Sequence, residues 1–199
     1  MTVKTKAELI FEKFCSTNGI WFRRIEECDQ PTPDYIVILG EQTLFVEVKQ
    51  IDKDDNFSNE TSSKRTVGAH IRKKIQQARK QAQTVSNSET PFVLLVYNNL
   101  DGAQLFGTEP HDFVDAMYGE TTLLFDKSKN KITDSFQGRN QSLSDGKNTS
   151  FSTIGHLKVS ESQIGVKLFE NIFAKNKLEF SRIPDFIEVI RIEVENGCA

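Results

Sequence analysis

The chain has 199 residues, enough for a single domain with a substantial buried core. Hydrophobic residues make up 37% and charged residues 27%, proportions that exclude a fibrous or a disordered protein. The net charge of −3, taken alone, argues against a general nucleic-acid binder. The three cysteines form no CxxC pair, and the sequence shows neither a secretory signal nor an apolar run of bilayer length. We therefore expect a cytoplasmic protein that makes no contact with a membrane.

The first half of the chain alternates between helical and strand patterns. Residues 6–18 carry apolar side chains at three- and four-residue spacing, which predicts an amphipathic helix that ends at Asn18-Gly19. Trp21 and the phenylalanines are expected in the core, with a base-stacking role for one of them left open. The elements predicted next are a strand at 20–27, a hydrophobic hairpin at 33–49, a polar loop at 51–68, a helix at 69–85 and a buried strand at 91–97.

The second half of the chain is mostly β in its pattern. The predicted elements are a short helix at 109–118, strand pairs at 121–125 with 131–136 and at 150–160 with 164–170, and a last strand at 184–194. We therefore expect a mixed α/β protein. Residues 1–100 would form its core, and residues 101–199 a β-rich extension packed on the same domain.

The hairpin, PDYIVILGEQTLFVEVK, carries charged residues at its open end. A two-residue loop at Gly40-Glu41, expected as a type II′ turn with glycine first, pairs residues whose numbers sum to 81. Asp34 then lies directly opposite Glu47 on one face. Lys49, two residues further along, projects to the same face.

Two opposed carboxylates repel each other and destabilise a hairpin unless a cation lies between them. Hard divalent ions such as Mg²⁺ bind one or two carboxylates together with water and phosphate oxygens. The register therefore predicts a metal site with an adjacent ammonium group. The alternative is a solvent-exposed hairpin end, where the lysine only neutralises the acids.

These charged residues resemble a known signature. Pro33-Asp34 and, after a hydrophobic spacer, Glu47-Val48-Lys49 resemble the motif of the PD-(D/E)XK nuclease superfamily. The predicted order of helix, three strands, helix and strand over residues 6–98 is similar to that fold, nearest in pattern to the archaeal Holliday-junction resolvases. The resemblance implies a restriction-endonuclease-like mixed sheet flanked by helices, and it does not reach the C-terminal half.

The resemblance also implies a mechanism. Asp34 and Glu47 would hold Mg²⁺, or Mn²⁺ as a substitute, with the carbonyl of Val48 as a further ligand. Lys49 would orient or help to deprotonate the attacking water and would neutralise charge on the phosphate.

An early acid belongs to the same resemblance. In the resembling enzymes a helix carries a glutamate upstream of a glycine that precedes the first strand, and here Glu8 leads to Gly19. Glu8 would reach a second metal ion or the nucleophilic water. Glu12, one helical turn further on a similar face, is the alternative, and a plain solvated position for Glu8 is left open.

Residues 61–88 are strongly basic. They include seven positive charges and no acid, so the rest of the chain carries −10 within the total of −3. A cationic segment on an acidic protein is typical of a contact with a phosphate backbone, although a charged helix face can also be merely solvated. The residues expected to bind nucleic acid are Lys64, Arg65, Arg72, Lys73, Lys74, Gln77, Arg79 and Lys80.

Together these features favour a Mg²⁺-dependent nuclease that hydrolyses phosphodiester bonds, an endonuclease acting on DNA rather than RNA. One alternative is a nuclease-fold module that binds nucleic acid or a protein partner without cleaving. Another is a partner module of the toxin–antitoxin kind. Because resembling folds are often dimeric, a homodimer is also expected. His70, His111 and His156 form no metal or triad pattern.

Overall fold

The chain folds as an α/β protein, and a computed structural model describes residues 3–26, 29–53, 66–100, 104, 106–160 and 163–192. Its elements are α1 (Lys6–Thr17), β1 (Trp21–Arg24), β2 (Tyr35–Leu39), β3 (Gln42–Ile51), α2 (Ala69–Thr84), β4 (Phe92–Asn98), α3 (Pro110–Tyr118), β5 (Thr121–Asp126), β6 (Lys131–Gln137), β7 (Thr153–Ser160), β8 (Gln163–Glu170), the 3₁₀-helix η1 (Phe180–Arg182) and β9 (Ile187–Ile190). Every predicted helix and strand is present, with ends displaced by a few residues. Most of the loop predicted at 51–68, and the end of the strand predicted at 184–194, lie outside the described residues.

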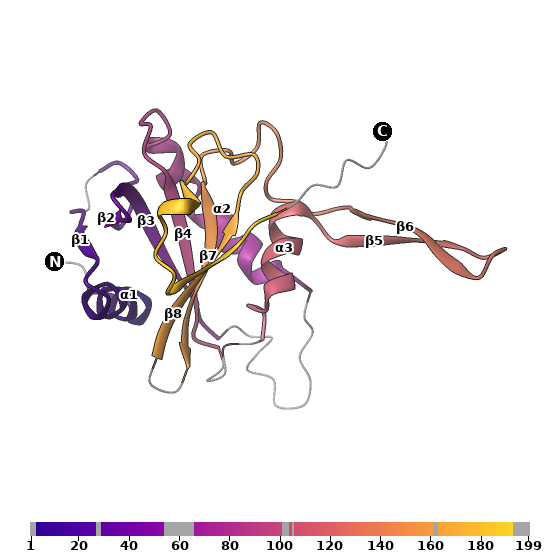
Figure 1. The fold of residues 1–199 in the computed structure, drawn as a ribbon, viewed down its shortest axis with the longest axis horizontal. Coiled ribbons are helices and arrows are strands. Elements are labelled where there is room, and N and C mark those ends of the chain that lie inside the picture. The colour runs from indigo at the N-terminus through magenta and orange to yellow at the C-terminus, as the bar shows by residue number, and fades with distance from the viewer. Residues whose placement is uncertain are drawn as a thin grey trace.

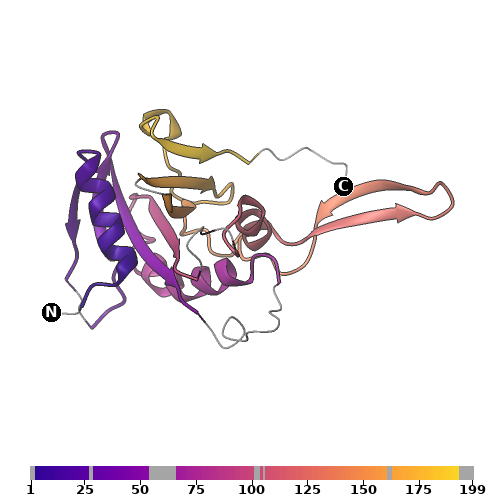
Figure 2. The same cartoon turned by 90° about the horizontal axis from the view of Figure 1, so that it is seen from below.

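Seven strands form one mixed sheet in the order β1–β2–β3–β4–β7–β8–β9. β1, β2 and β3 are an antiparallel meander, whereas β3, β4 and β7 run parallel. β8 then pairs antiparallel with β7 and parallel with β9. Strands from both halves of the chain therefore share one sheet. β5 and β6 form a separate two-stranded ribbon that projects away from the rest of the molecule (Figures 1 and 2).

Helices pack on both faces of this sheet. α1 buries the stripe Ala7, Phe11, Phe14 and Cys15 against one face, as its spacing predicted. α2 and α3 contribute to a second hydrophobic core on the other face. All seven residues of β4 are buried between the two cores. None of the helices in the described part of the chain is both long enough and apolar enough to cross a bilayer.

The edge strand β1 has two different faces. Phe22 packs against Phe11 of α1 and Tyr35 of β2. Trp21, by contrast, is 51% exposed. The prediction that Trp21 is a core residue is therefore wrong, because strand alternation turns it to the face opposite Phe22.

Candidate active site at the β2–β3 hairpin

The β2–β3 hairpin has the predicted register. Tyr35 pairs with Val46 and Leu39 with Gln42, so the numbers of partners sum to 81. The expectation of a type II′ turn is wrong, because Gly40 and Glu41 both have positive φ, 55° and 67°, as a type I′ turn requires. Both turn types close a two-residue loop, so the register is the same.

Asp34 and Glu47 meet at the open end of this hairpin. The amide of Asp34 donates to Oε2 of Glu47 at 3.2 Å, and the amide of Val48 donates to Oδ2 of Asp34 at 2.8 Å. Glu47 is 1% exposed and Asp34 is partly buried. Oδ1 of Asp34 accepts no hydrogen bond from any described residue. The two acids are therefore neighbours, with one carboxylate oxygen still available.

Lys49 lies on the same side of the sheet as Glu47. Its Nζ is 2.5 Å from Oε1 of Glu47, and its side chain is 25% exposed. The ammonium group therefore contacts the buried acid, while the side chain as a whole remains partly exposed. The alternative of a solvent-exposed hairpin end does not describe Glu47, which is enclosed.

Burial is the main influence on the acidity of both carboxyl groups. It raises the pKa of Glu47 to about 7, with Asp34 adding to the rise and Lys49 opposing it. Burial also raises the pKa of Asp34, against the hydrogen bond from Val48 and the charge of Lys49. A further cation would favour the charged form of both acids. The paired oxygen donors therefore fit a hard divalent ion.

Glu8 lies near these acids but is held by other partners. Its Oε2 accepts hydrogen bonds from the amide and hydroxyl of Thr5, in a capping box at the start of α1. Its Oε1 is 3.1 Å from a guanidinium nitrogen of Arg24. Burial raises the pKa of Asp34, and the nearby charge of Glu8 adds to that rise. Glu8 is 6% exposed, so it is not a solvated helix position.

Glu12, the alternative to Glu8, is also engaged. It forms a 2.7 Å ion pair with Lys4 and accepts a 3.0 Å hydrogen bond from the hydroxyl of Tyr35. Asp34, Glu47 and either glutamate do not form a set whose ligand atoms all lie within 4.8 Å of one another among the described residues. In this arrangement neither glutamate converges with the hairpin acids.

α2 brings part of the basic segment close to the site. Burial lowers the pKa of Lys74, and the charges of Lys73 and Lys49 lower it further, while Asp52 opposes them. Lys74 therefore lies within electrostatic reach of Lys49. The basic segment begins shortly after Lys49 in the sequence, which led us to expect it close to the metal site.

The other cations of the segment have different surroundings. Arg72 donates to the backbone carbonyls of Val67 and Asp115 and lies 3.7 Å from Glu120, so it is committed to the fold. Lys64 and Arg65 lie outside the described residues. The side chains exposed on α2 include Lys73, Gln77, Arg79 and Lys80.

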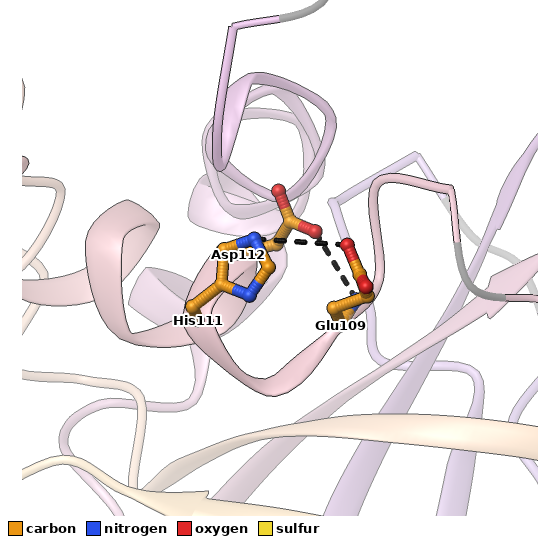
Figure 3. A group of neighbouring side chains, drawn as sticks. All are labelled: Glu109, His111 and Asp112. Carbon is orange, nitrogen blue, oxygen red and sulfur yellow. Dashed lines mark hydrogen bonds and ion pairs between the residues drawn. The ribbon is translucent and has the colours of Figure 1, made fainter.

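A second acidic group, Glu109, His111 and Asp112, lies at the start of α3 (Figure 3). It is the one set of three such residues, within the described ranges, whose ligand atoms all lie within 4.8 Å of one another. Asp112 is fully buried and accepts hydrogen bonds from the amides of Gly68 at 2.9 Å and Glu109 at 3.1 Å. The capping box of α3 accounts for the bond from Glu109, and a tertiary contact with the backbone of Gly68 accounts for the other, so neither requires a cation. Sequence reasoning assigned His111 no role, although Glu109 and Asp112 have capping-box spacing.

Five charged side chains thus gather beside the open end of the β2–β3 hairpin: Asp34, Glu47, Lys49, Glu8 and Arg24. Three are acids and two are cations, and Lys74 of α2 adds a further positive charge within electrostatic reach of Lys49. Comparison with protein-family models, with curated proteins and with solved structures finds no match to this chain.

Proposed function

We propose that this protein is a divalent-metal-dependent endonuclease with a restriction-endonuclease-like core, which hydrolyses phosphodiester bonds in DNA. The observation that carries the proposal is the meeting of Asp34 and Glu47 at the open end of the hairpin, with Lys49 on the same face. The order α1–β1–β2–β3–α2–β4 supports it, because the resemblance implies that order. The parallel pairing of β4 with β3 across α2 is further support.

Each hairpin residue would have a separate role in the hydrolysis of a phosphodiester bond. Asp34, Glu47 and the carbonyl of Val48 would hold the ion; the amide of Val48 points at Asp34, and in an extended strand the carbonyl leaves the same edge. A bound Mg²⁺ or Mn²⁺ would supply positive charge to the scissile phosphate. Lys49 would donate to a phosphate oxygen or to the attacking water, since its side chain is partly exposed beside Glu47.

Glu8 would be the outer acid of the site. It holds Arg24 within electrostatic reach of Asp34, and its own charge also acts on Asp34. To bind a second ion it would have to release Arg24. We therefore assign Glu8 first a positioning role, with ligation of a second metal ion as a further step.

α2 would hold the DNA backbone. Lys74 lies within electrostatic reach of Lys49, and Lys73, Arg79 and Lys80 are exposed along the same helix. When such cations bind phosphates, the counterions of the DNA are released, so the affinity for DNA falls steeply as the salt concentration rises. Gln77 would add an uncharged donor.

A nuclease-fold module that binds nucleic acid without cutting is the second candidate. The 2.5 Å contact between Lys49 and Glu47 favours it, because the lysine neutralises one buried acid without a metal ion. The two candidates differ in one observable, which is hydrolysis that requires a divalent ion.

The test is a cleavage assay on circular, linear, single-stranded and branched DNA, with RNA alongside, in Mg²⁺, Mn²⁺ or EDTA. We expect circular DNA to be cut in Mg²⁺ and left intact in EDTA, and Glu47→Gln and Lys49→Ala to abolish cutting. Lys167→Ala is the matched control, because it breaks a 2.8 Å ion pair with Glu188 between β8 and β9 and should cut normally. Undiminished cutting by both hairpin variants would overturn the site. DNA binding without metal-dependent cutting would support the second candidate.

A further inference from the structure

One face of β1 and β2 is apolar and largely uncovered. Its residues, called here the open face, are Trp21, Arg23, Ile36 and Ile38. Their neighbours along the strands, such as Phe22 and Val37, pack toward α1 instead. α2 packs on β3 and β4, and the described residues leave Trp21 51% and Ile38 44% exposed. Large apolar side chains gathered in this way indicate a binding surface.

The strand register connects the open face to the candidate active site. Arg23 pairs with Ile36 and Trp21 with Ile38, two and four residues beyond Asp34 along the chain. A strand advances about 3.3 Å per residue, so the Arg23–Ile36 pair lies roughly 7 Å from Asp34 and the Trp21–Ile38 pair roughly 13 Å from it. A few nucleotides of an extended strand would span this distance.

The open face also carries a positive charge. Arg23 is exposed and forms no ion pair with an acid in the described ranges. Its neighbour Arg24 instead reaches Glu8 on the α1 side. An exposed guanidinium group between an indole ring and the Asp34–Glu47 pair is suited to a ligand that alternates flat rings with phosphates.

We propose that the open face binds unpaired bases of a single DNA strand whose backbone passes Arg23 into the Asp34–Glu47 site. The inference rests on the proposed function, because it names the form of the substrate. Trp21 stacks on one base, Ile36 and Ile38 provide apolar contact beside it, and Arg23 contacts a phosphate. A duplex does not fit this surface in the same way, because its base faces are already stacked on each other.

Charge favours DNA over a second copy of this chain as the occupant. In a symmetric dimer the same patch lies on both subunits, so exposed Arg23 would face a surface that carries the same positive charge. Like charges brought together in this way are destabilising. A phosphodiester strand supplies the opposite charge.

Trp21 is the single tryptophan of the chain, so its fluorescence reports on the open face directly. The experiment titrates the full-length protein with a short oligothymidylate in EDTA, where no cleavage competes, and measures affinity separately by anisotropy of a labelled strand. We expect quenching of Trp21 on binding. Trp21→Ala should weaken binding about tenfold, with Trp21→Phe recovering part of the loss. Arg23→Gln should weaken binding and reduce its dependence on salt.

The matched control is Phe186→Ala. Phe186 is 47% exposed, comparable to Trp21, but packs against Phe14 of α1, so its loss should leave binding unchanged. Binding of oligothymidylate without quenching would overturn the proposal, as would equal quenching by a duplex of the same length. Stronger quenching by an RNA strand, or a dimer that dissociates in Trp21→Ala, would overturn it as well.

Failure of this inference can be told apart from failure of the nuclease assignment. Metal-dependent cleavage of duplex DNA together with an unquenched Trp21 would remove the open-face proposal and keep the nuclease. Quenching by single-stranded DNA with no cleavage in any metal would keep the binding surface and remove the nuclease.

Discussion

Glu47 couples the stability of the fold to pH. Burial, with the neighbouring Asp34, raises its pKa from the ordinary 4.5 to about 7. Between these values the folded protein keeps a proton that the unfolded chain has lost, so stability falls as pH rises. The contribution is complete below pH 4.5 and is lost as pH passes 7. Asp34 acts in the same direction, because its pKa is raised as well.

Replacing Glu47 by glutamine should therefore flatten the pH profile of stability. Glutamine resembles the protonated acid and does not titrate. The free energy of unfolding of the wild type should fall relative to Glu47→Gln by on the order of 2 kcal/mol between pH 5 and pH 8. Urea unfolding in EDTA measures this difference. Glu188→Gln, which alters an exposed acid, should follow the wild type, and parallel profiles for wild type and Glu47→Gln would contradict the prediction.

A divalent ion should compete with protons for the same two acids. Because Asp34 and Glu47 must be charged to bind it, Mn²⁺ should bind more tightly at pH 8 than at pH 6 and should release protons on binding. Calorimetry in buffers of different ionisation enthalpy measures the protons released. Asp34→Asn should abolish the heat of binding, whereas Glu188→Gln should not. Affinity that is independent of pH would show that the ion binds elsewhere.

At the level of elements, the hairpin was predictable and its surroundings were not. A two-residue loop at Gly40-Glu41 allows one register, and that register already places Asp34 beside Glu47. The turn type was missed because Glu41 adopts a positive φ, which is uncommon outside glycine and asparagine. Alternation places Trp21 on one face of β1, but which face a helix covers depends on packing between distant segments.

Long-range contacts explain the other omissions. Asp112 caps its own helix and also accepts a hydrogen bond from Gly68, 44 residues earlier. A single sequence indicates local features, such as a helix cap or an apolar helical stripe. It does not indicate which distant residue the folded chain will bring into contact with them.

The β5–β6 ribbon makes a prediction of its own. Its apolar side chains Leu123, Phe125 and Ile132 are each more than half exposed, and Phe136 is 48% exposed, so they contribute little to a core. Replacing residues 121–137 by an Asn-Gly turn should change the free energy of unfolding by no more than about 0.5 kcal/mol.

Urea unfolding at several protein concentrations measures this effect of the ribbon. A loss of stability that shrinks with dilution would indicate that the ribbon packs on a second copy, because only concentrated wild type would gain from the association. A loss at all concentrations would indicate that it packs on its own domain. Either loss would contradict the prediction.

For the whole molecule, the decisive feature is the sheet that both halves of the chain complete. β4 ends the first half, and all seven of its residues are buried between β3 and β7. The core on the α1 face likewise includes Leu157, Leu168 and Ile183 from the second half. The first half on its own would expose both the edge of β4 and its apolar side chains.

A fragment of residues 1–100 should therefore fail to fold, although it contains every residue assigned to the nuclease site. An unpaired and largely apolar edge strand favours aggregation, and removing the C-terminal strands deprives both hydrophobic cores of part of their packing. We expect no cooperative unfolding transition by circular dichroism and no sharp dispersion of amide signals by NMR. The ribbon deletion is the matched control, since it also removes residues of the second half but leaves the seven-stranded sheet intact. A fragment that unfolds cooperatively would show that the first half is an independent domain, and that β7–β9 are an accessory to it.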